Sequence, residues 1–279
     1  MAFNLPKYIR DPNAPPKYLT GKSRSNWIRN ARREQQNYLY GQQFPIFHIP
    51  STYYEIHHIH RFTSPDTLTF LIEHINKCRR FSIDTESDCN TNEIALIQIN
   101  SIPQTLPSLV ILVELNHLPQ FDTPLFEQIC LLFKLMFNSL NTLYGWGDLV
   151  VELEKAISFH IFSFPLACKC INLQDDFKVW IERNPPPCEE CGSDNNDILY
   201  RCECNWLPHV GTNETWSIQS ALRFTCRLFL DKSYTRSRWS KMLDPKYSTI
   251  SSTKLKALLR YASYDTLGVT YFTQPVTRN

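Results

Sequence analysis

Hydrophobic positions recur with two different spacings along this chain, and the spacings predict its elements. Ser64-Pro65-Asp66 predicts a helix start, with Ser64 as the capping hydroxyl and Pro65 in the first turn. Apolar residues then follow the helical repeat, so a helix is expected from residue 64 to about residue 80. Short runs rich in Ile, Val and Leu then predict three strands, at 81–85, 94–99 and 109–115. Three strands in a row, with no helix between them, favour an antiparallel meander.

The remainder of the chain alternates between the two patterns. Helices are expected at 124–137, 148–157, 216–229 and 253–273, and further strands at 142–146 and 170–173. This succession predicts an α/β fold, in which a mixed sheet of an antiparallel meander plus parallel strands is flanked by helices.

The first 45 residues have a different composition. They hold eight Lys or Arg but only two acids, Asp11 and Glu34. Residues 23–40 predict a short helix that carries Arg29, Arg32 and Arg33. We therefore divide the chain into a basic N-terminal arm, 1–45, and a folded domain, 46–279. An arm that binds a phosphate backbone and a solvated, partly disordered tail both fit this composition.

Composition excludes several classes of protein. With 43% hydrophobic and 20% charged residues in 279, the chain can bury a core and is not mainly disordered. Its longest apolar runs are too short to cross a bilayer, and the first thirty residues hold no secretory signal. These features predict an intracellular protein, nuclear or cytoplasmic, with no membrane partner. The net charge of +2 does not by itself indicate a polyanion partner.

Two carboxylates two residues apart mark the first predicted strand of the meander. Asp84 and Glu86 point to the same face, because side chains alternate along a strand. Carboxylates that close repel each other unless one takes up a proton or a cation neutralises them. A divalent metal ion resolves this repulsion, although such pairs also commonly end strands that face solvent.

Two further acidic positions are weaker signals when taken alone. Asp148 follows a strand that ends in glycines and opens a helix, as an ordinary helix cap does. Tyr261 and Asp265 are four residues apart and share one face of the last predicted helix.

Together, in this order and on these elements, the three segments resemble the proofreading-type 3′-5′ exonucleases of the ribonuclease H-like fold. The signature of that superfamily is Asp, Glu, Asp and Asp in three motifs, and the Tyr places the chain near its tyrosine subgroup. The segments Ser217-Ile218-Gln219, Asp231-Lys232-Ser233 and Ser237-Arg238-Trp239-Ser240 are similar to the stretch before the third motif in the ribonuclease D and Werner-helicase exonuclease branch. The resemblance spans about residues 51–275.

The resemblance implies a two-metal hydrolysis of phosphodiesters. Asp84 would bridge two Mg²⁺ or Mn²⁺ ions, Glu86 and Asp265 would complete the first site, and Asp148 would hold the second ion largely through water. Tyr261 would orient the attacking water. Asp175 and Asp176 are rival acids for the second motif, but they suit a helix start better. The implied substrates are 3′ ends of single-stranded or frayed DNA or RNA, and the implied products are nucleoside 5′-monophosphates.

A cysteine cluster predicts a second kind of metal site. Two short pairs of thiols, within an insertion at 183–208, have the spacing of a closed structural Zn²⁺ site: Cys188, Cys191, Cys202 and Cys204. Cys168 and Cys170 could compete as ligands, but their apolar strand context favours ordinary buried thiols.

Basic and aromatic residues alternate after residue 231. Lys232, Arg236 and Arg238, next to Tyr234 and Trp239, are candidates to bind a nucleic-acid strand near the active centre. A solvated face fits the same residues, with Trp239 in the core.

A histidine group near the start of the folded domain has a structural interpretation. If His57, His58 and His60 belong to one strand, its alternation lets at most two of them cooperate, so we expect no metal site there.

Two other functions remain open. The chain could be a catalytically inactive member of the fold that binds nucleic acid or protein, or a zinc-centred interaction module in which the carboxylates only cap elements. The sequence specifies neither DNA nor RNA, and it indicates no protein partner or oligomeric state.

Overall fold

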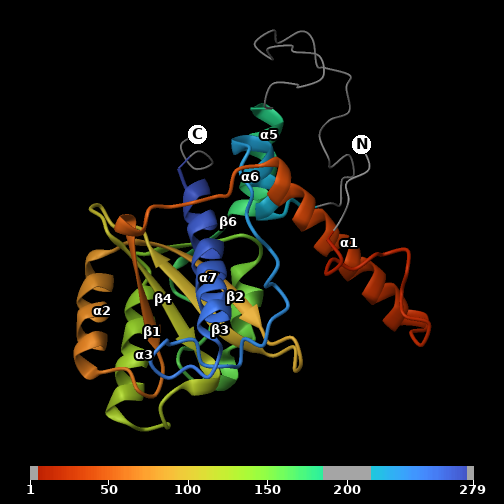
Figure 1. Ribbon diagram of the computed structural model, residues 1–279. Helices are drawn as coiled ribbons and strands as arrows, with labels where there is room; N and C mark the ends of the chain where they lie inside the picture. Colours follow the sequence, from red (N-terminus) through yellow and green to blue (C-terminus); the bar gives the residue numbers. More distant parts are fainter. Residues whose placement is uncertain (1–5, 185–214, 275–279) are drawn as a thin grey trace.

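The centre of the molecule is one six-stranded sheet, seen in the computed structural model of Figure 1, which describes residues 6–184 and 215–274. The strand order is β1-β4-β3-β2-β5-β6. The strands are β1 (Tyr54–Ile59), β2 (Arg80–Ser87), β3 (Ile94–Ser101), β4 (Ser108–Glu114), β5 (Thr142–Gly145) and β6 (Lys169–Asn172).

The sheet mixes two directions. β2, β3 and β4 pair antiparallel as the predicted meander, whereas β5 pairs parallel with β2, β6 with β5, and β1 with β4. Every residue of β3 and β4 is buried, as expected for central strands covered on both faces. The predicted mixed α/β sheet is therefore confirmed.

Helices cover both faces of the sheet (Figure 1). One hydrophobic cluster joins one face to α2 (Pro65–Lys77), α3 (Pro124–Met136) and α4 (Leu149–Glu154). A second cluster joins the other face to α5 (Leu173–Arg183), α6 (Ile218–Cys226) and α7 (Ser252–Phe272). Short 3-10 turns lie at Ser51–Tyr53, Leu115–His117 and Ile157–Phe159.

Several boundaries differ from those predicted. The first helix of the domain begins where expected, because Ser64 accepts a hydrogen bond from the Thr67 amide, but it ends at Lys77. α6 ends at Cys226 because Arg227 adopts a left-handed conformation with φ 58°. α5, which follows β6 directly, was not predicted as a helix, although Asp175 and Asp176 do occupy its first turn as a helix start.

The N-terminal arm contains a long helix, α1 (Gly21–Gln43), which extends away from the sheet in Figure 1. Its C-terminal part packs against α6, where the Arg223 guanidinium lies 3.8 Å from the centre of the Tyr40 ring. The helix is longer than the 23–40 predicted. Among the described helices, none has the length and apolar character that crossing a bilayer requires.

Candidate active site

The alternation of β2 places its two acids on the α7 side of the sheet. Phe81 and Ile83 are buried in the cluster with α2 and α3. Asp84 and Glu86, at the alternate positions, therefore face the opposite layer. Asp84 pairs in register with Gln98 of β3. Between Glu86 and Ser87 the pairing of β2 with β3 shifts register, as at a β-bulge.

The third carboxylate comes from α7. Asp265 is almost fully buried, and one ligand oxygen from each of Asp84, Glu86 and Asp265 lies within 4.8 Å of the others. Asp84 and Glu86 are each about 180 residues from Asp265 in the sequence, so only the fold brings the three together. The structure thus assembles three of the four acids that the sequence singled out. We call Asp84, Glu86 and Asp265 the acidic group.

Burial and mutual repulsion shift the protonation of this group. Burial, followed by the charge of Asp265, raises the pKa of Asp84 to about 7. The same two causes raise the pKa of Glu86 well above its usual value. A raised pKa lets a carboxyl group keep its proton to higher pH, and a bound metal ion must displace that proton.

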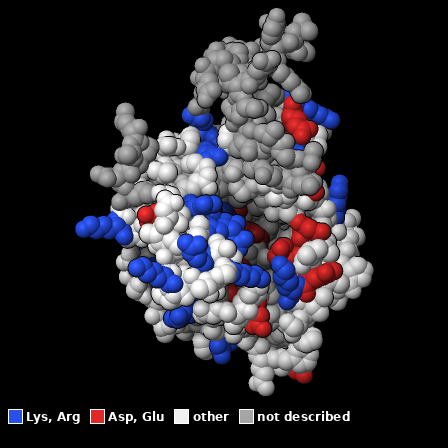
Figure 2. Space-filling model, turned by 90° about the vertical axis from the view of Figure 1, so that its right-hand side faces the viewer, with Lys and Arg blue, Asp and Glu red and all other residues white. Residues whose placement is uncertain are grey.

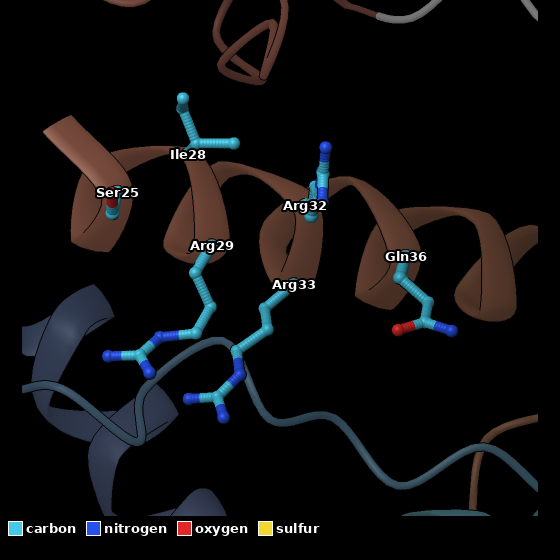
Figure 3. Close-up of a pocket in the computed structure, with 6 residues that line it drawn as sticks. All are labelled: Ser25, Ile28, Arg29, Arg32, Arg33 and Gln36. Atoms are coloured by element: carbon cyan, nitrogen blue, oxygen red, sulfur yellow. The ribbon is translucent and has the colours of Figure 1, made fainter.

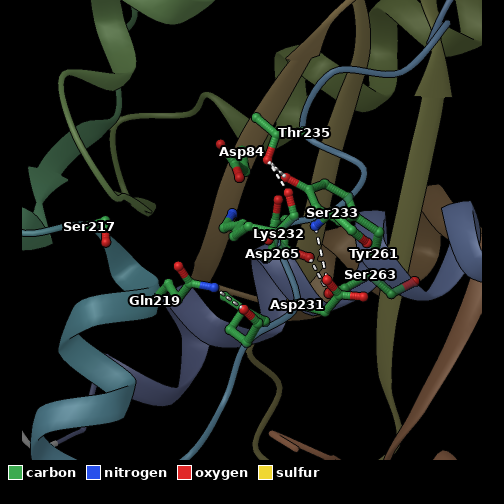
Figure 4. Close-up of polar contacts among 12 residues, drawn as sticks. Asp84, Ser217, Gln219, Asp231, Lys232, Ser233, Thr235, Tyr261, Ser263 and Asp265 are labelled. Carbon is green, nitrogen blue, oxygen red and sulfur yellow. Dashed lines mark hydrogen bonds and ion pairs between the residues drawn. The ribbon is translucent and has the colours of Figure 1, made fainter. Parts of the chain in front are cut away.

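A lysine lies among the carboxylates (Figure 4). The ammonium Nζ of Lys232 donates to Asp265 Oδ1 at 2.7 Å and lies 5.3 Å from the centre of the Tyr261 ring. Burial acts to lower the pKa of Lys232, but the carboxylates of Asp265 and Asp84 outweigh it, so the pKa lies above its usual value. The sequence suggested a phosphate contact for Lys232, and the structure places it as a counter-ion of the acidic group.

The acidic group fits a divalent cation. The second oxygen of Asp265, Oδ2, is buried and has no hydrogen-bond partner. An unpaired buried carboxylate oxygen is costly, and a cation would satisfy it. Oxygen donors alone suit Mg²⁺ or Mn²⁺ better than softer metals.

Asp148 lies at the N-cap of α4 and is exposed. Its carboxylate accepts hydrogen bonds from the amides of Val150 and Val151, as the capping interpretation predicted. It is not among the three residues that meet in the acidic group. Its chain neighbours Gly147 and Leu149 do line a small hollow together with Asp84, so the N-terminus of α4 borders the site.

Glu152, one helical turn after Asp148, was missed by the sequence analysis. It lines the same hollow, and its Oε2 accepts a hydrogen bond from Thr85 Oγ1 at 3.3 Å. Its charge also contributes to the raised pKa of Asp84. The signal was present in the sequence, because acids four apart on a helix share a face.

Tyr261 lies next to the acids with its hydroxyl against Thr235. Its ring packs 5.6 Å from Trp239, and its hydroxyl and Thr235 Oγ1 are 2.9 Å apart. Burial, and then the charges of Asp265 and Glu86, raise the pKa of Tyr261 far above its usual value. The phenol is therefore neutral, which fits positioning and excludes a role as a base at ordinary pH.

The segment that carries Lys232 is tied to the sheet by buried acids. Asp88 accepts from the amide and hydroxyl of Ser240, and Glu114 accepts from the amides of Leu243 and Asp244. Trp239, next to the anchored Ser240, is buried, as its core interpretation predicted.

Two candidate arginines are not among the described residues that meet in the acidic group. Arg236 and Arg238 are exposed on the segment that follows Lys232. The predicted zinc ligands Cys188, Cys191, Cys202 and Cys204, and most of the 183–208 insertion, lie outside the described residues.

The histidines and remaining cysteines have structural surroundings. His60 is buried and its Nε2 lies 2.8 Å from Asp244 Oδ2. Cys168 is a buried free thiol and Cys170 a partly buried one. Within the described ranges, no group of metal-ligating side chains other than the acidic one comes together.

Comparison with known proteins identifies the fold. No protein-family model matches the sequence, and no curated protein matches it. Among solved structures, the chain is similar to the EXO domain of Nibbler from Aedes aegypti, with 14% identity and a TM-score of 0.52, over 84% of this chain and 91% of that one. It is also similar to RNase D of Trypanosoma brucei in complex with U12 RNA, with 15% identity and a TM-score of 0.50, over 88% of this chain and 66% of that one.

RNase D of Escherichia coli gives a weaker match, with 14% identity and a TM-score of 0.46, over 80% of this chain and 44% of that one. The chain therefore spans less than two thirds of these RNase D chains. At such identities the likeness shows the fold, and this chain has the fold of these exonuclease domains, as the sequence resemblance implied.

Proposed function

We propose that this protein is a metal-dependent 3′-5′ exonuclease that hydrolyses phosphodiester bonds at the ends of single-stranded or frayed DNA or RNA. The observation that carries the proposal is the meeting of Asp84, Glu86 and Asp265 within 4.8 Å, on a fold shared with exonuclease domains. Nucleoside 5′-monophosphates would be the products.

Metal binding and positioning of the attacking water would fall to different residues. Asp84, Glu86 and Asp265 would hold Mg²⁺ or Mn²⁺, and Asp148 would contribute to a second ion at the edge of the site. When bound, paired cations lower the pKa of a water molecule and stabilise the leaving 3′ oxygen. Tyr261 would orient the water through its neutral hydroxyl, which lies in hydrogen-bond contact with Thr235 Oγ1.

The proposal is tested with oligonucleotides labelled at the 5′ end. With Mg²⁺ or Mn²⁺, the purified full chain should shorten single-stranded DNA or RNA stepwise from the 3′ end, and a blocked 3′ end should protect the substrate. An Asp84→Ala variant should be inactive. Intact oligonucleotides with the wild-type protein, in every combination of substrate and metal, would refute the proposal.

A second candidate is a catalytically inactive binding module. The Lys232–Asp265 ion pair favours it, because a permanent counter-ion could replace a metal ion in the acidic group. Binding of oligonucleotides without metal-dependent shortening would support this alternative.

Replacing Tyr261 with phenylalanine should lower the turnover rate by roughly 10²-fold, the size of effect that misplacing a reacting group causes. Because the phenol is neutral, the pH dependence of the remaining activity should match that of the wild type. A Tyr234→Phe variant, on the loop before α7 and with its ring 6.4 Å from that of Tyr261, serves as the control. A changed pH profile in Tyr261→Phe would show that its proton takes part in the reaction.

Asp148→Asn and Glu152→Gln separate the N-cap acid of α4 from the acid one helical turn later. Asparagine caps helices as well as aspartate, so Asp148→Asn should keep its fold. We expect Asp148→Asn to lose roughly 10-fold or more of the activity, since it removes a charge that would act on the second ion. Glu152→Gln should lose less, because the exposed ion pair with Lys155, at 2.6 Å, offsets part of the charge of Glu152. The reverse order would assign the second-motif role to Glu152.

A further inference from the structure

The helix α1 presents an exposed basic face. Arg29, Arg32 and Arg33 are all exposed, and Arg29 donates to the amide oxygen of Asn26 at 2.9 Å. In the part of the chain that the structure describes, none of the three arginines pairs with a carboxylate. Glu34, the one acid of α1, is paired with Arg10. The positive charge of this face is therefore uncompensated by described residues.

A hollow of about 440 Å³ lies along α1 beside these arginines (Figure 3). Arg29 and Arg33 project from the same side of the helix and form the basic face, whereas Arg32 projects from the other side. The described residues that line the hollow are Ser25, Ile28, Arg29, Arg32, Arg33 and Gln36.

A different face of α1 is covered by the chain before it. Arg10 lies 5.7 Å from the ring centre of Trp27, and Tyr8 packs edge-on against Tyr38 at 6.5 Å. These contacts use helix positions away from Arg29 and Arg33. The segment before α1 thus holds the helix and leaves the arginines open to solvent.

Asn37 connects α1 to the segment that carries Lys232, which contacts the acidic group. The Asn37 amide oxygen accepts from the backbone N–H of Lys232 at 3.0 Å, and its amide nitrogen donates to Asp231 at 2.9 Å. Lys232 in turn holds Asp265. With a rise of 1.5 Å per residue, Arg33 and Arg29 lie about 6 Å and 12 Å from Asn37 along the helix axis. Figure 2, which views the side from which α1 extends, shows Lys and Arg gathered beside acidic side chains.

We infer that the basic face of α1 binds the phosphate backbone of the nucleic-acid substrate, on the 5′ side of the end held at the acidic group; this inference rests on the proposed function. A guanidinium group can donate two parallel hydrogen bonds to the oxygens of one phosphate. An arginine that is not paired with a carboxylate does not have to break an ion pair before it binds a phosphate. The face is an extension of the site, so it acts only on substrates long enough to reach it.

The test measures binding without turnover. Every variant is made in the full-length Asp84→Ala chain, and affinity is followed by fluorescence anisotropy for labelled oligouridylates and oligothymidylates of about 4 and about 16 nucleotides. Arg29→Ala/Arg33→Ala should weaken binding of the longer oligonucleotides about tenfold. The slope of log affinity against log salt should fall by about 1.4, since each lost phosphate contact on a single strand removes about 0.7. Affinity for the shorter ones should change less than about twofold.

The matched control is Lys77→Ala/Lys134→Ala, which removes two exposed charges from α2 and α3 on the opposite side of the sheet. It should change neither affinity nor slope. An unchanged affinity of Arg29→Ala/Arg33→Ala for long oligonucleotides would overturn the inference, and so would an equal loss for both lengths. Loss of binding to polyglutamate with oligonucleotide binding intact would instead assign the face to an acidic protein. Failure of the wild type to shorten oligonucleotides would refute the exonuclease proposal alone, because this binding assay needs no turnover.

Discussion

Replacing Asp265 with asparagine should abolish nuclease activity while the protein remains folded. We expect a loss above the roughly 10- to 100-fold that follows removal of a group around a metal ligand, because the Asp265 carboxylate would itself bind the ion. Its buried, unpaired Oδ2 is the oxygen that a cation would satisfy. The asparagine keeps an oxygen that can accept from Lys232 Nζ, and it removes one of the charges that raise the pKa of Asp84 and Glu86. The fold should therefore tolerate the change.

The measurements are the rate of oligonucleotide shortening and the binding of Mn²⁺ by calorimetry. Asp176→Asn is the matched control, since it makes the same chemical change at an exposed acid in the first turn of α5 and also tests a rival for the second motif. It should keep activity within about twofold, as surface substitutions usually do. Asp265→Asn with activity within tenfold of the wild type, or with unchanged Mn²⁺ affinity, would contradict the proposed site.

Metal binding should depend steeply on pH near neutrality. Because the pKa of Asp84 is raised to about 7, a proton occupies the acidic group in the metal-free protein below that pH. A cation must displace it, so the apparent affinity for Mn²⁺ should fall about tenfold for each pH unit below 7 and for each displaced proton. Above pH 7 Asp84 has lost its proton, so Asp84 should no longer make the affinity for Mn²⁺ depend on pH.

The stability of the metal-free protein should change with pH in the direction opposite to its metal affinity. A carboxyl whose pKa is higher in the folded state than in the unfolded state stabilises the fold when protonated. The contribution of Asp84 is fully present below about pH 4 and is lost as the pH rises toward 7. Denaturant unfolding after chelation should show this loss between about pH 4 and 7, and saturating Mn²⁺ should reverse it most strongly at high pH.

Lys232→Met provides an internal check on this behaviour. The Lys232 charge lowers the pKa of both Asp84 and Glu86, so its removal should move the pH midpoint of Mn²⁺ binding upward. A midpoint that stays in place or moves downward would show that Lys232 does not interact with these carboxyls in solution.

Local periodicity accounts for what the sequence predicted well. Asp84 and Glu86 share a face because strand side chains alternate, and Tyr261 and Asp265 share a face because a helix repeats about every four residues. Both relations hold in the structure. The capping of the first domain helix by Ser64 is equally local, and it was also predicted.

Relations across long stretches of chain were not predictable in this way. Lys232 is 33 residues from Asp265, and Asn37 is 195 residues from Lys232, yet both pairs are in contact. The sequence placed Lys232 on a phosphate-binding stretch, because nothing in its neighbours shows that it turns inward. Only the packing of α1, α6 and α7 against one another sets these distances.

The sequence by itself determined the order of most elements, the face of each carboxylate on its own strand or helix, and the kind of cation those oxygens prefer. The tertiary structure decided which carboxylates meet, which cation of the protein neutralises them, and where the basic helix lies relative to them. The physical reason is that alternation and helical repeat depend on neighbouring residues, whereas burial, charge repulsion and ion pairing depend on distances that exist only once the two faces of the sheet are covered.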